Sequence, residues 1–224
     1  AAPATKDLAR LLDDPEVRMP ALHAIEAIGP EAYQAVPDIA KLLTHPDFYV
    51  RVGANLTLGA MGCPLDKRDR SGRRSPSQHA AIVIKPLTVA FQDDFAELAR
   101  DAAGMLSVMG PLAKPALPAA ITMLDHPSLT HRSAALGLII CLGPDAAPAV
   151  PKLIKMLDNK FGESRYIDAL AAIGSVASAA IPALEQYAAK KDPGPTQADS
   201  YYALFCIRGE IFDLRRMVNL LKDA

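Results

Sequence analysis

The chain has 224 residues, of which 50% are hydrophobic and 22% are charged, a composition that is ordinary for a globular protein with a sizeable core. Its formal net charge of −1 gives no overall attraction to nucleic acid or to an anionic membrane, so we expect no nucleic-acid partner. No uninterrupted apolar run approaches the ~20 residues that a bilayer-spanning helix needs, so we expect no membrane span.

Cysteine usage and the first residues leave the cellular compartment open. The three cysteines form neither a CxxC motif nor a disulfide framework, and Cys141 and Cys206, which lie inside apolar runs, are expected to be buried thiols. The chain begins AAPAT without a methionine, which is compatible with a mature end after signal-peptide cleavage or with a trimmed chain. The first reading favours an exported or periplasmic protein over a cytoplasmic one, and the localisation itself stays unknown.

An internal repeat organises the whole chain. Six short apolar runs are each followed by a glycine, and the intervals between these glycines are 33, 48, 33, 31 and 35 residues. The glycines are Gly29, Gly62, Gly110, Gly143, Gly174 and Gly209. Four of them are followed eight residues later by a proline: Pro37, Pro118, Pro151 and Pro182. A fixed period in this range is typical of a helical repeat protein.

Each unit is predicted to contain a helix A and then a helix B that ends at the glycine. The units, in chain order, are 1–29, 30–62, 63–110, 111–143, 144–174 and 175–209. In every unit a large apolar residue stands four positions before the glycine, and an alanine or tyrosine stands eight before it, so both belong to one buried helical stripe. The residues that we expect to be buried between repeats include Leu58, Leu106, Ile139 and Leu170.

Glycine and proline are predicted to mark the helix ends. The glycine is expected to end helix B in the left-handed conformation, and the Gly-Pro pairs that begin at Gly29, Gly110 and Gly143 should turn the chain. The later proline is compatible with the first turn of the next helix, or with a kink in a longer helix. Pro86 is expected to take the same role in the third unit.

The third unit carries an insert, residues 63–78, which reads CPLDKRDRSGRRSPSQ. Because it is rich in Arg, Ser, Pro and Gly, it cannot bury an apolar face, and we expect an exposed loop outside the repeat stack. Its basic residues are Lys67, Arg68, Arg70, Arg73 and Arg74. Two interpretations stay open, namely a solvated loop and a contact with an acidic partner or a phosphate.

A last helix, predicted over residues 210–222, closes the array. Its apolar residues share one stripe, with charged residues on the other side: Ile211, Leu214, Met217, Val218 and Leu221. A more polar terminal helix is what an end cap of a repeat array requires.

Two sequence runs define the pattern of the unit: AVPDIAKLL at 35–43 and YVRVGANLTLGAMG at 49–62. The first is echoed by ALPAAITML at 116–124 and AVPKLIKML at 149–157. This pattern resembles HEAT repeats, and more narrowly the short bacterial kind called phycobilisome-lyase-like HEAT repeats. The resemblance covers nearly the whole chain outside the insert. It implies a single all-α domain over 1–224, a right-handed α-solenoid of about six HEAT-like helix pairs plus a C-terminal capping helix.

The resemblance also implies a role for an arginine near the start of helix B. Arg18, Arg51 and Arg132 each lie eleven residues before the closing glycine, where the family has its helix-B arginine. In the first two units Asp14 and Asp47 lie four residues before the arginine. In such families this Asp–Arg pair ties the turns of neighbouring repeats together.

No residue pattern indicates catalysis or a bound metal. The chain has no GxSxG-type elbow, no Cys/His arrangement and no glycine-rich phosphate loop. Deoxyhypusine hydroxylase, a HEAT-like enzyme, binds iron through His-Glu dipeptides, which this chain lacks. His45 and His126 precede prolines in turns, and His23 with Glu26 does not complete a metal shell. We therefore expect no catalytic residue, no cofactor and no metal, and a protein that is not an enzyme.

The B helices of HEAT arrays line the concave face, and two rows of residues six and ten positions before the glycine should lie there. The candidate partner-binding residues are Met19, His23, Val52, Leu56, Arg100, Ser133, Ser164, Asp168 and Asp199. These rows are small, mildly apolar and mixed in charge, which suits a peptide or another protein surface better than a polyanion. Alternatively, these positions partly pack against neighbouring B helices.

The resulting hypothesis is a non-catalytic protein–protein interaction scaffold that binds a partner protein or peptide through the concave helix-B face. One alternative is an accessory or lyase-type protein that handles a tetrapyrrole or another prosthetic group, because bilin lyases share this repeat. Another is a docked subunit of a larger complex. The identity of the partner and the oligomeric state stay open.

Overall fold

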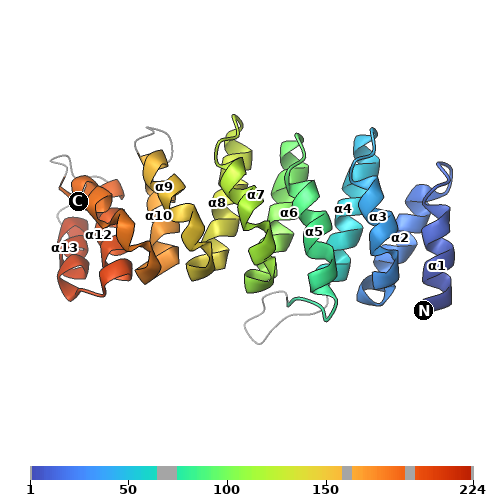
Figure 1. Cartoon of the computed structure of the whole chain (residues 1–224), viewed down its shortest axis with the longest axis horizontal. Helices are drawn as coiled ribbons and strands as arrows, with labels where there is room; N and C mark the ends of the chain where they lie inside the picture. The colour runs from blue at the N-terminus through green and yellow to red at the C-terminus, as the bar shows by residue number, and fades with distance from the viewer. Residues whose placement is uncertain (1, 65–74, 158–162, 190–194, 223–224) are drawn as a thin grey trace. The chain divides into compact units, whose positions relative to one another are not determined.

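The computed structural model describes residues 2–64, 75–157, 163–189 and 195–222, and every regular element in these ranges is a helix (Figure 1). Six helix pairs follow one another along the described residues, and one further helix comes last. The predicted fold class, an all-α helical-repeat solenoid, is thereby confirmed. The chain divides into two compact units, residues 1–135 (unit 1) and 136–224 (unit 2), and each is described by itself. The single domain and the right-handed twist remain predictions.

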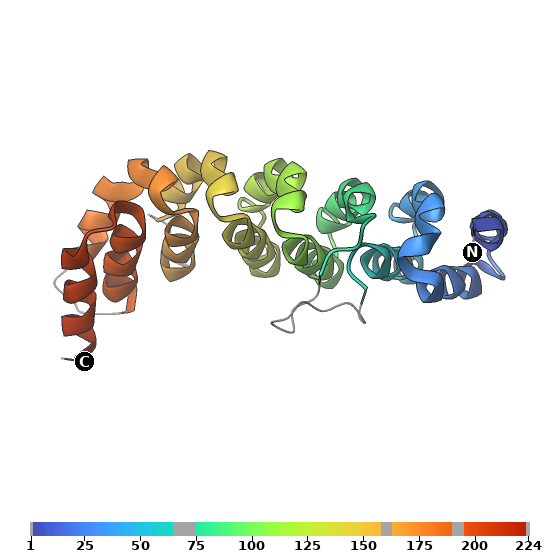
Figure 2. The same cartoon turned by 90° about the horizontal axis from the view of Figure 1, so that it is seen from below.

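Unit 1 has two layers of helices, with the A helices in one and the B helices in the other (Figure 2). The A layer contains α1 (Ala2–Leu11), α3 (Val36–Leu42), α5 (Ala80–Phe91) and α7 (Leu117–Met123). The B layer contains α2 (Arg18–Ile28), α4 (Phe48–Gly62), α6 (Ala96–Val108) and the first part of α8 (Leu129–Leu142). Helix α4 contacts both α2 and α6, so these three B helices form a continuous layer.

Unit 2 repeats this arrangement with its own helix pairs. Its A helices are α9 (Val150–Leu157) and α11 (Ile181–Ala188), and its B helices are α10 (Glu163–Ile173) and α12 (Pro195–Arg208). Helix α10 contacts α9 and α12, and the last helix, α13 (Ile211–Lys222), packs on α12. Unit 2 therefore also has a B layer, which is formed by α10 and α12.

The closing glycines end the B helices as predicted, with one exception. A positive φ angle, which favours glycine, occurs at Gly29, Gly110, Gly143, Gly174 and Gly209. Gly62 lacks this conformation and is instead the last residue of α4. A Cβ atom at Gly62 would lie 2.4 Å from Cε of Met109 and 2.7 Å from Cγ2 of Val83. Gly62 is therefore required for close packing, and its predicted role as a left-handed cap is wrong.

Short 3₁₀ helices follow four of these glycines, where only a turn was expected. They are η1 (Gly29–Ala35), η2 (Gly110–Ala116), η3 (Gly143–Ala149) and η4 (Gly174–Ala180). Each leads into an A helix whose second residue is the repeated proline, where a missing amide hydrogen costs no helical hydrogen bond. Pro86 lies inside α5, so the alternative of a proline within a longer helix applies there.

The predicted core positions are buried. Leu58, Leu106, Ile139 and Leu170 are all 0% exposed, which confirms the register of the repeat. The residue at the same position in the last unit, Phe205, is only half-buried. The cysteine prediction is wrong for Cys141, which is exposed, and holds only partly for Cys206, which is half-buried.

The helix-B arginines bind the turn between helix A and helix B of their own repeat. Nε of Arg18 donates to the backbone oxygen of Leu12 at 2.7 Å. Arg51 and Arg132 donate from Nη1 to the equivalent backbone oxygens, those of His45 and His126, at 2.9 Å and 2.8 Å. Each arginine therefore fixes the path of the chain into its own helix B.

The link between neighbouring turns differs from the predicted Asp–Arg pair. Arg51 forms an ion pair with Asp93 of the next turn, with Nε 2.8 Å from Oδ2. The carboxylates of Asp14 and Asp47 instead accept hydrogen bonds from backbone amides two residues later, and Asp47 thereby caps α4. The turns are thus tied together, but by an aspartate of the following repeat.

Three residues near the ends of the predicted insert are packed, while Pro76 and Gln78 are exposed as predicted. Cys63, Pro64 and Ser77 are buried. The amide of Ser77 donates to the oxygen of Gly62 and its hydroxyl donates to the oxygen of Met61, both at 2.7 Å. These bonds close the base of the insert against the end of α4. The five basic residues of the insert lie outside the described residues: Lys67, Arg68, Arg70, Arg73 and Arg74.

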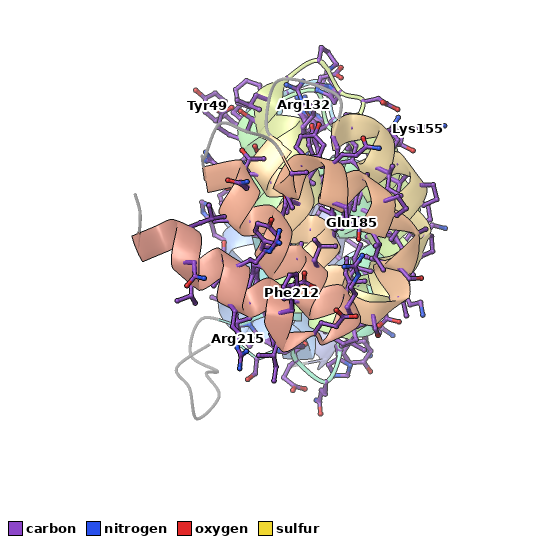
Figure 3. All side chains as sticks on the ribbon, turned by 90° about the vertical axis from the view of Figure 1, so that its left-hand side faces the viewer. Tyr49, Arg132, Lys155, Glu185, Phe212 and Arg215 are labelled. Carbon is purple, nitrogen blue, oxygen red and sulfur yellow. The ribbon has the colours of Figure 1, made fainter. Side chains whose placement is uncertain are left out.

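Helix α13 packs on α12 at the end of the array, as the predicted cap does, but its apolar stripe is only partly buried. Ile211 and Val218, which belong to that stripe, are 63% and 39% exposed, and Phe212 is 58% exposed (Figure 3). Asp213 is instead 3% exposed and lies 3.9 Å from the guanidinium of Arg208 on α12. The side of α13 that faces α12 therefore includes a charged residue that the predicted stripe did not contain.

Two stretches of the described chain are long and apolar enough, by length and composition, to cross a membrane: Leu129–Leu157 and Ser164–Ala188. Each joins a B helix to a 3₁₀ helix and the following A helix, with a positive-φ glycine between them. Core helices of a repeat fold pass the same test, and the apolar windows are 44% and 39% buried. The expectation of no membrane span remains a prediction.

Candidate functional site: the helix-B face

The candidate residues of unit 1 lie on the solvent-accessible side of its B helices. His23 on α2, Leu56 on α4 and Arg100 on α6 are exposed. Met19, Val52 and Ser133 are half-buried. Because α4 contacts both α2 and α6, the residues on these three helices belong to one surface, which we call the helix-B face of unit 1.

Glycines allow the B helices of unit 1 to approach closely. A Cβ atom at Gly53 would lie 2.9 Å from Cε of Met19, and one at Gly59 would lie 2.2 Å from Sδ of Met105. Met19 therefore also packs between α2 and α4, as the alternative interpretation of the rows allows. Gly104 on α6 has no atom within 4 Å of such a Cβ, so packing does not require a glycine there.

A hollow of about 460 Å³ opens beside the predicted residues of α2 and α4. Its lining is formed by His23, Glu26, Ala27, Ile28, Gly29, Pro30, Ala60 and Pro64. Most of these residues are apolar, while His23 and Glu26 supply the polar groups on one helix. Such a lining can receive an apolar side chain and orient it by one or two hydrogen bonds.

The candidate residues of unit 2 form a polar and acidic group. The hydroxyl of Ser164 on α10 hydrogen-bonds to the carboxylate of Asp199 on α12. Burial raises the pKa of the Asp168 carboxyl above its ordinary value, the Asp199 carboxylate raises it further, and Arg165 opposes the shift. Three residues predicted from two neighbouring repeats therefore lie together across α10 and α12.

Tyr202 belongs to this acidic group and was missed by the sequence analysis. Its side chain is 47% exposed, and its pKa is raised mainly by a hydrogen bond with Cys206, with a smaller effect from Asp168. Tyr202 follows Asp199 by three residues, a helical spacing that places both on one face. That spacing could have identified Tyr202 from the sequence. The predicted rows included only the positions six and ten residues before the closing glycine, and Tyr202 is at neither.

The described residues contain no group of three or more His, Cys, Asp and Glu side chains arranged to hold a metal ion. His45 and His126 serve the turns, because Nδ1 of each accepts a hydrogen bond from the backbone amide two residues later. The helix-B faces of the two units present apolar side chains, hydrogen-bonding groups and charges.

No protein-family model matches the chain, and no curated protein matches it in sequence. Solved structures do resemble it. An engineered protein is 18% identical over 92% of this chain and 96% of its own, with a TM-score of 0.57. A computationally designed armadillo repeat protein for modular peptide recognition is 18% identical over 90% of this chain and 99% of its own, with a TM-score of 0.59.

A natural structure also resembles the chain, the complex of CpcE and CpcF of phycocyanin lyase from Nostoc sp. PCC7120. It is 22% identical over 80% of this chain and 66% of its own, with a TM-score of 0.54. At these identities the likeness concerns the fold. The fold of the chain is a helical repeat similar to those of the designed armadillo repeat protein and of the phycocyanin lyase complex.

Proposed function

We propose that the protein is a non-catalytic scaffold that binds a partner polypeptide through the helix-B face of unit 1. The observation that carries this proposal is Leu56, a large apolar side chain that is 42% exposed in the middle of the face. Val52 and Ala60 extend it along α4 as half-buried apolar neighbours. A contiguous apolar strip of this kind, edged by polar groups, is a common feature of protein-interaction surfaces.

The surroundings of Leu56 favour a polypeptide over other ligands. His23 and Glu26 line the hollow next to α4, and Arg100 is exposed on α6. A helix or an extended peptide could insert an apolar residue into the hollow and meet these polar groups with its own side chains. The resemblance to armadillo repeat proteins designed for peptide recognition supports this class of partner.

The experiment compares affinity capture from the native source with wild-type protein and with Leu56→Asp. A charge in the middle of the apolar strip should abolish capture of the partner, since it is costly to desolvate a carboxylate against an apolar surface. Leu112→Asp is the matched control, because Leu112 is similarly exposed, at 47%, but lies on η2. A partner that is retained by Leu56→Asp, or lost equally from both variants, would contradict the proposal.

A second candidate is an accessory role in handling a tetrapyrrole or another prosthetic group. The observation that favours it is the resemblance to the phycocyanin lyase complex. Ultraviolet–visible absorption of the protein purified from its host tests it directly. A chromophore that copurifies with wild-type protein would support this candidate and would argue against a pure scaffold. A third candidate, a docked subunit of a larger complex, predicts that the partner copurifies in fixed stoichiometry.

A further inference from the structure

A second surface of unit 1 lies at the turns between its A and B helices, at the upper edge in Figure 1. Tyr49, Phe95 and Leu129 are 74%, 44% and 62% exposed there, and each lies at or next to the first residue of a B helix. With the half-buried Phe48, they form what we call the turn surface. Figure 3 shows Tyr49 at this edge, which it shares with Arg132.

The aromatic side chains of the turn surface contact one another across two repeats. The ring centroids of Phe48 and Phe95 are 3.9 Å apart, and those of Phe48 and Tyr49 are 5.7 Å apart. Phe48 therefore bridges α4 and α6. An apolar residue at a helix start often packs back onto its own helix, but that role does not account for the exposure of Tyr49 and Leu129. The fold does not use these apolar areas.

The charges around the turn surface are predominantly negative. Asp47, Asp94 and Glu97 are exposed neighbours of the aromatic residues in the chain and have no ion-pair partner among the described residues. The nearby cations are already engaged. Arg51 binds two backbone oxygens and Asp93, and Arg132 binds two backbone oxygens. Lys41 at the end of α3 lies 2.7 Å from Asp38.

A hollow of about 490 Å³ lies between the second and third turns. Its lining combines apolar, polar and charged residues: Leu43, Thr44, His45, Pro46, Arg51, Val89, Gln92, Asp93 and Asp94. Arg51 is paired with Asp93, so Asp94 supplies the carboxylate without an ion-pair partner among the described residues. A long basic side chain fits this lining, with its methylene groups against Val89 and its charge near the Asp94 carboxylate. The ring faces of Tyr49 and Phe95 offer further sites for a cation.

We propose that the turn surface docks a polypeptide segment of a partner protein in which basic and apolar side chains alternate. The apolar side chains pack on Tyr49, Phe95 and Leu129. The basic side chains meet Asp47, Asp94 and Glu97, one of them inside the hollow. This surface is separate from the helix-B face, so the protein would contact partners on two sides of unit 1.

The test uses a short fluorescein-labelled peptide of alternating arginine and leucine, with a glutamate–leucine peptide as the charge control. Fluorescence anisotropy should show binding of the first peptide only. Tyr49→Ser should weaken this binding by roughly tenfold or more, as for other aromatic contact residues. Leu112→Ser, which removes a similarly exposed apolar side chain from η2, should leave the affinity unchanged.

The carboxylates are tested by the combined variant Asp47→Asn, Asp94→Asn and Glu97→Gln. Asparagine still caps α4 at position 47, so the fold should persist, which circular dichroism checks. Binding should weaken several-fold at low salt, and the difference from wild type should shrink at high salt. Glu31→Gln, at an exposed carboxylate in η1, is the matched control and should have no effect.

Three outcomes would overturn the proposal. The first is equal affinity of the arginine–leucine peptide for wild type and Tyr49→Ser. The second is a loss of affinity in Leu56→Asp as large as that in Tyr49→Ser, which would show that the peptide binds to the helix-B face. The third is a dimer that forms without peptide and is abolished by Tyr49→Ser in analytical ultracentrifugation, because the occupant would then be a second copy of the chain.

Discussion

The helix-B faces of the two units occupy the same repeat positions and differ in chemistry. In unit 1 these positions hold Val52 and Leu56, and the face is apolar with polar residues at its edge. In unit 2 they hold Ser164, Asp168 and Asp199, which form a hydrogen-bonded acidic group. The core positions of both units nevertheless hold fully buried aliphatic residues, except Phe205 in the last repeat, which is half-buried. A repeat therefore fixes its core and leaves the exposed positions of the same helix free to acquire different partners.

The two faces also differ in how much of their surface is left for contact with another molecule. Leu56 offers apolar area that remains exposed, which favours contact with another apolar surface. The unit 2 group already uses its polar atoms internally, because Ser164 bonds to Asp199 and Tyr202 bonds to Cys206. Its carboxylates lie close enough for Asp199 to raise the pKa of Asp168. The helix-B face of unit 2 therefore has an acidic character that the face of unit 1 lacks.

The largest predicted effect tests what the two units share. Leu106→Ala in unit 1 and Leu170→Ala in unit 2 should each lower the free energy of unfolding by about 2–5 kcal/mol, because both side chains are fully buried. Leu112→Ala, at an exposed position, should change it by no more than about 0.5 kcal/mol. Urea unfolding followed by far-UV circular dichroism measures all three. A loss below about 1 kcal/mol at either core position would mean that the units are not built on the same core.

The fold was predictable from the sequence because the repeat period determines where the helices begin and end. The intervals between glycines located every B helix, and the apolar residue four positions earlier identified Leu58, Leu106, Ile139 and Leu170 as core. The two-layer arrangement follows from a helix with one buried stripe, since such a helix must pack on a neighbour. Local signals of this kind are repeated along the chain, so a single departure does not obscure them.

The errors fall where contacts between distant residues decide the outcome. Gly62 looks like the other closing glycines, but Met109 and Val83 make it a packing residue. Asp213 turns inward on α13 because of Arg208, which no periodicity reveals. The turn surface was missed for the same reason. The contact between Phe48 and Phe95 joins repeats on either side of the insert, so their adjacency has no counterpart in local sequence.

The next prediction compares two glycines of the unit 1 B helices. Gly62→Ala should lower the free energy of unfolding by about 1–3 kcal/mol, because its Cβ would overlap Met109 and Val83. Gly104→Ala should raise it by roughly 0.5–1 kcal/mol, because no atom lies near the added methyl group and alanine favours a helix. Urea unfolding of the two variants measures the difference. Destabilisation by Gly104→Ala would show that the open space beside α6 is occupied in solution.

The smallest predicted effect concerns the acidic group of unit 2. The pKa of Asp168 is raised in the folded state, so between the unfolded and folded pKa values the folded protein binds more protons than the unfolded chain. The free energy of unfolding therefore falls as pH rises through this window. Asp168→Asn should remove that part of the pH dependence and stabilise the protein near pH 7 by no more than about 0.5 kcal/mol, since the side chain is only partly shielded from solvent.

The matched variants for this prediction are Asp168→Glu and Asp199→Asn. Asp168→Glu retains a carboxyl group and should retain the pH dependence of the free energy of unfolding. Asp199→Asn removes the neighbouring charge and should lower the pKa of Asp168, as measured by NMR titration of its carboxyl carbon. The decrease should be partial, because burial is the larger cause of the shift and remains after the substitution. An unchanged pKa would show that the two carboxylates are not neighbours and that unit 2 lacks the acidic group that distinguishes it from unit 1.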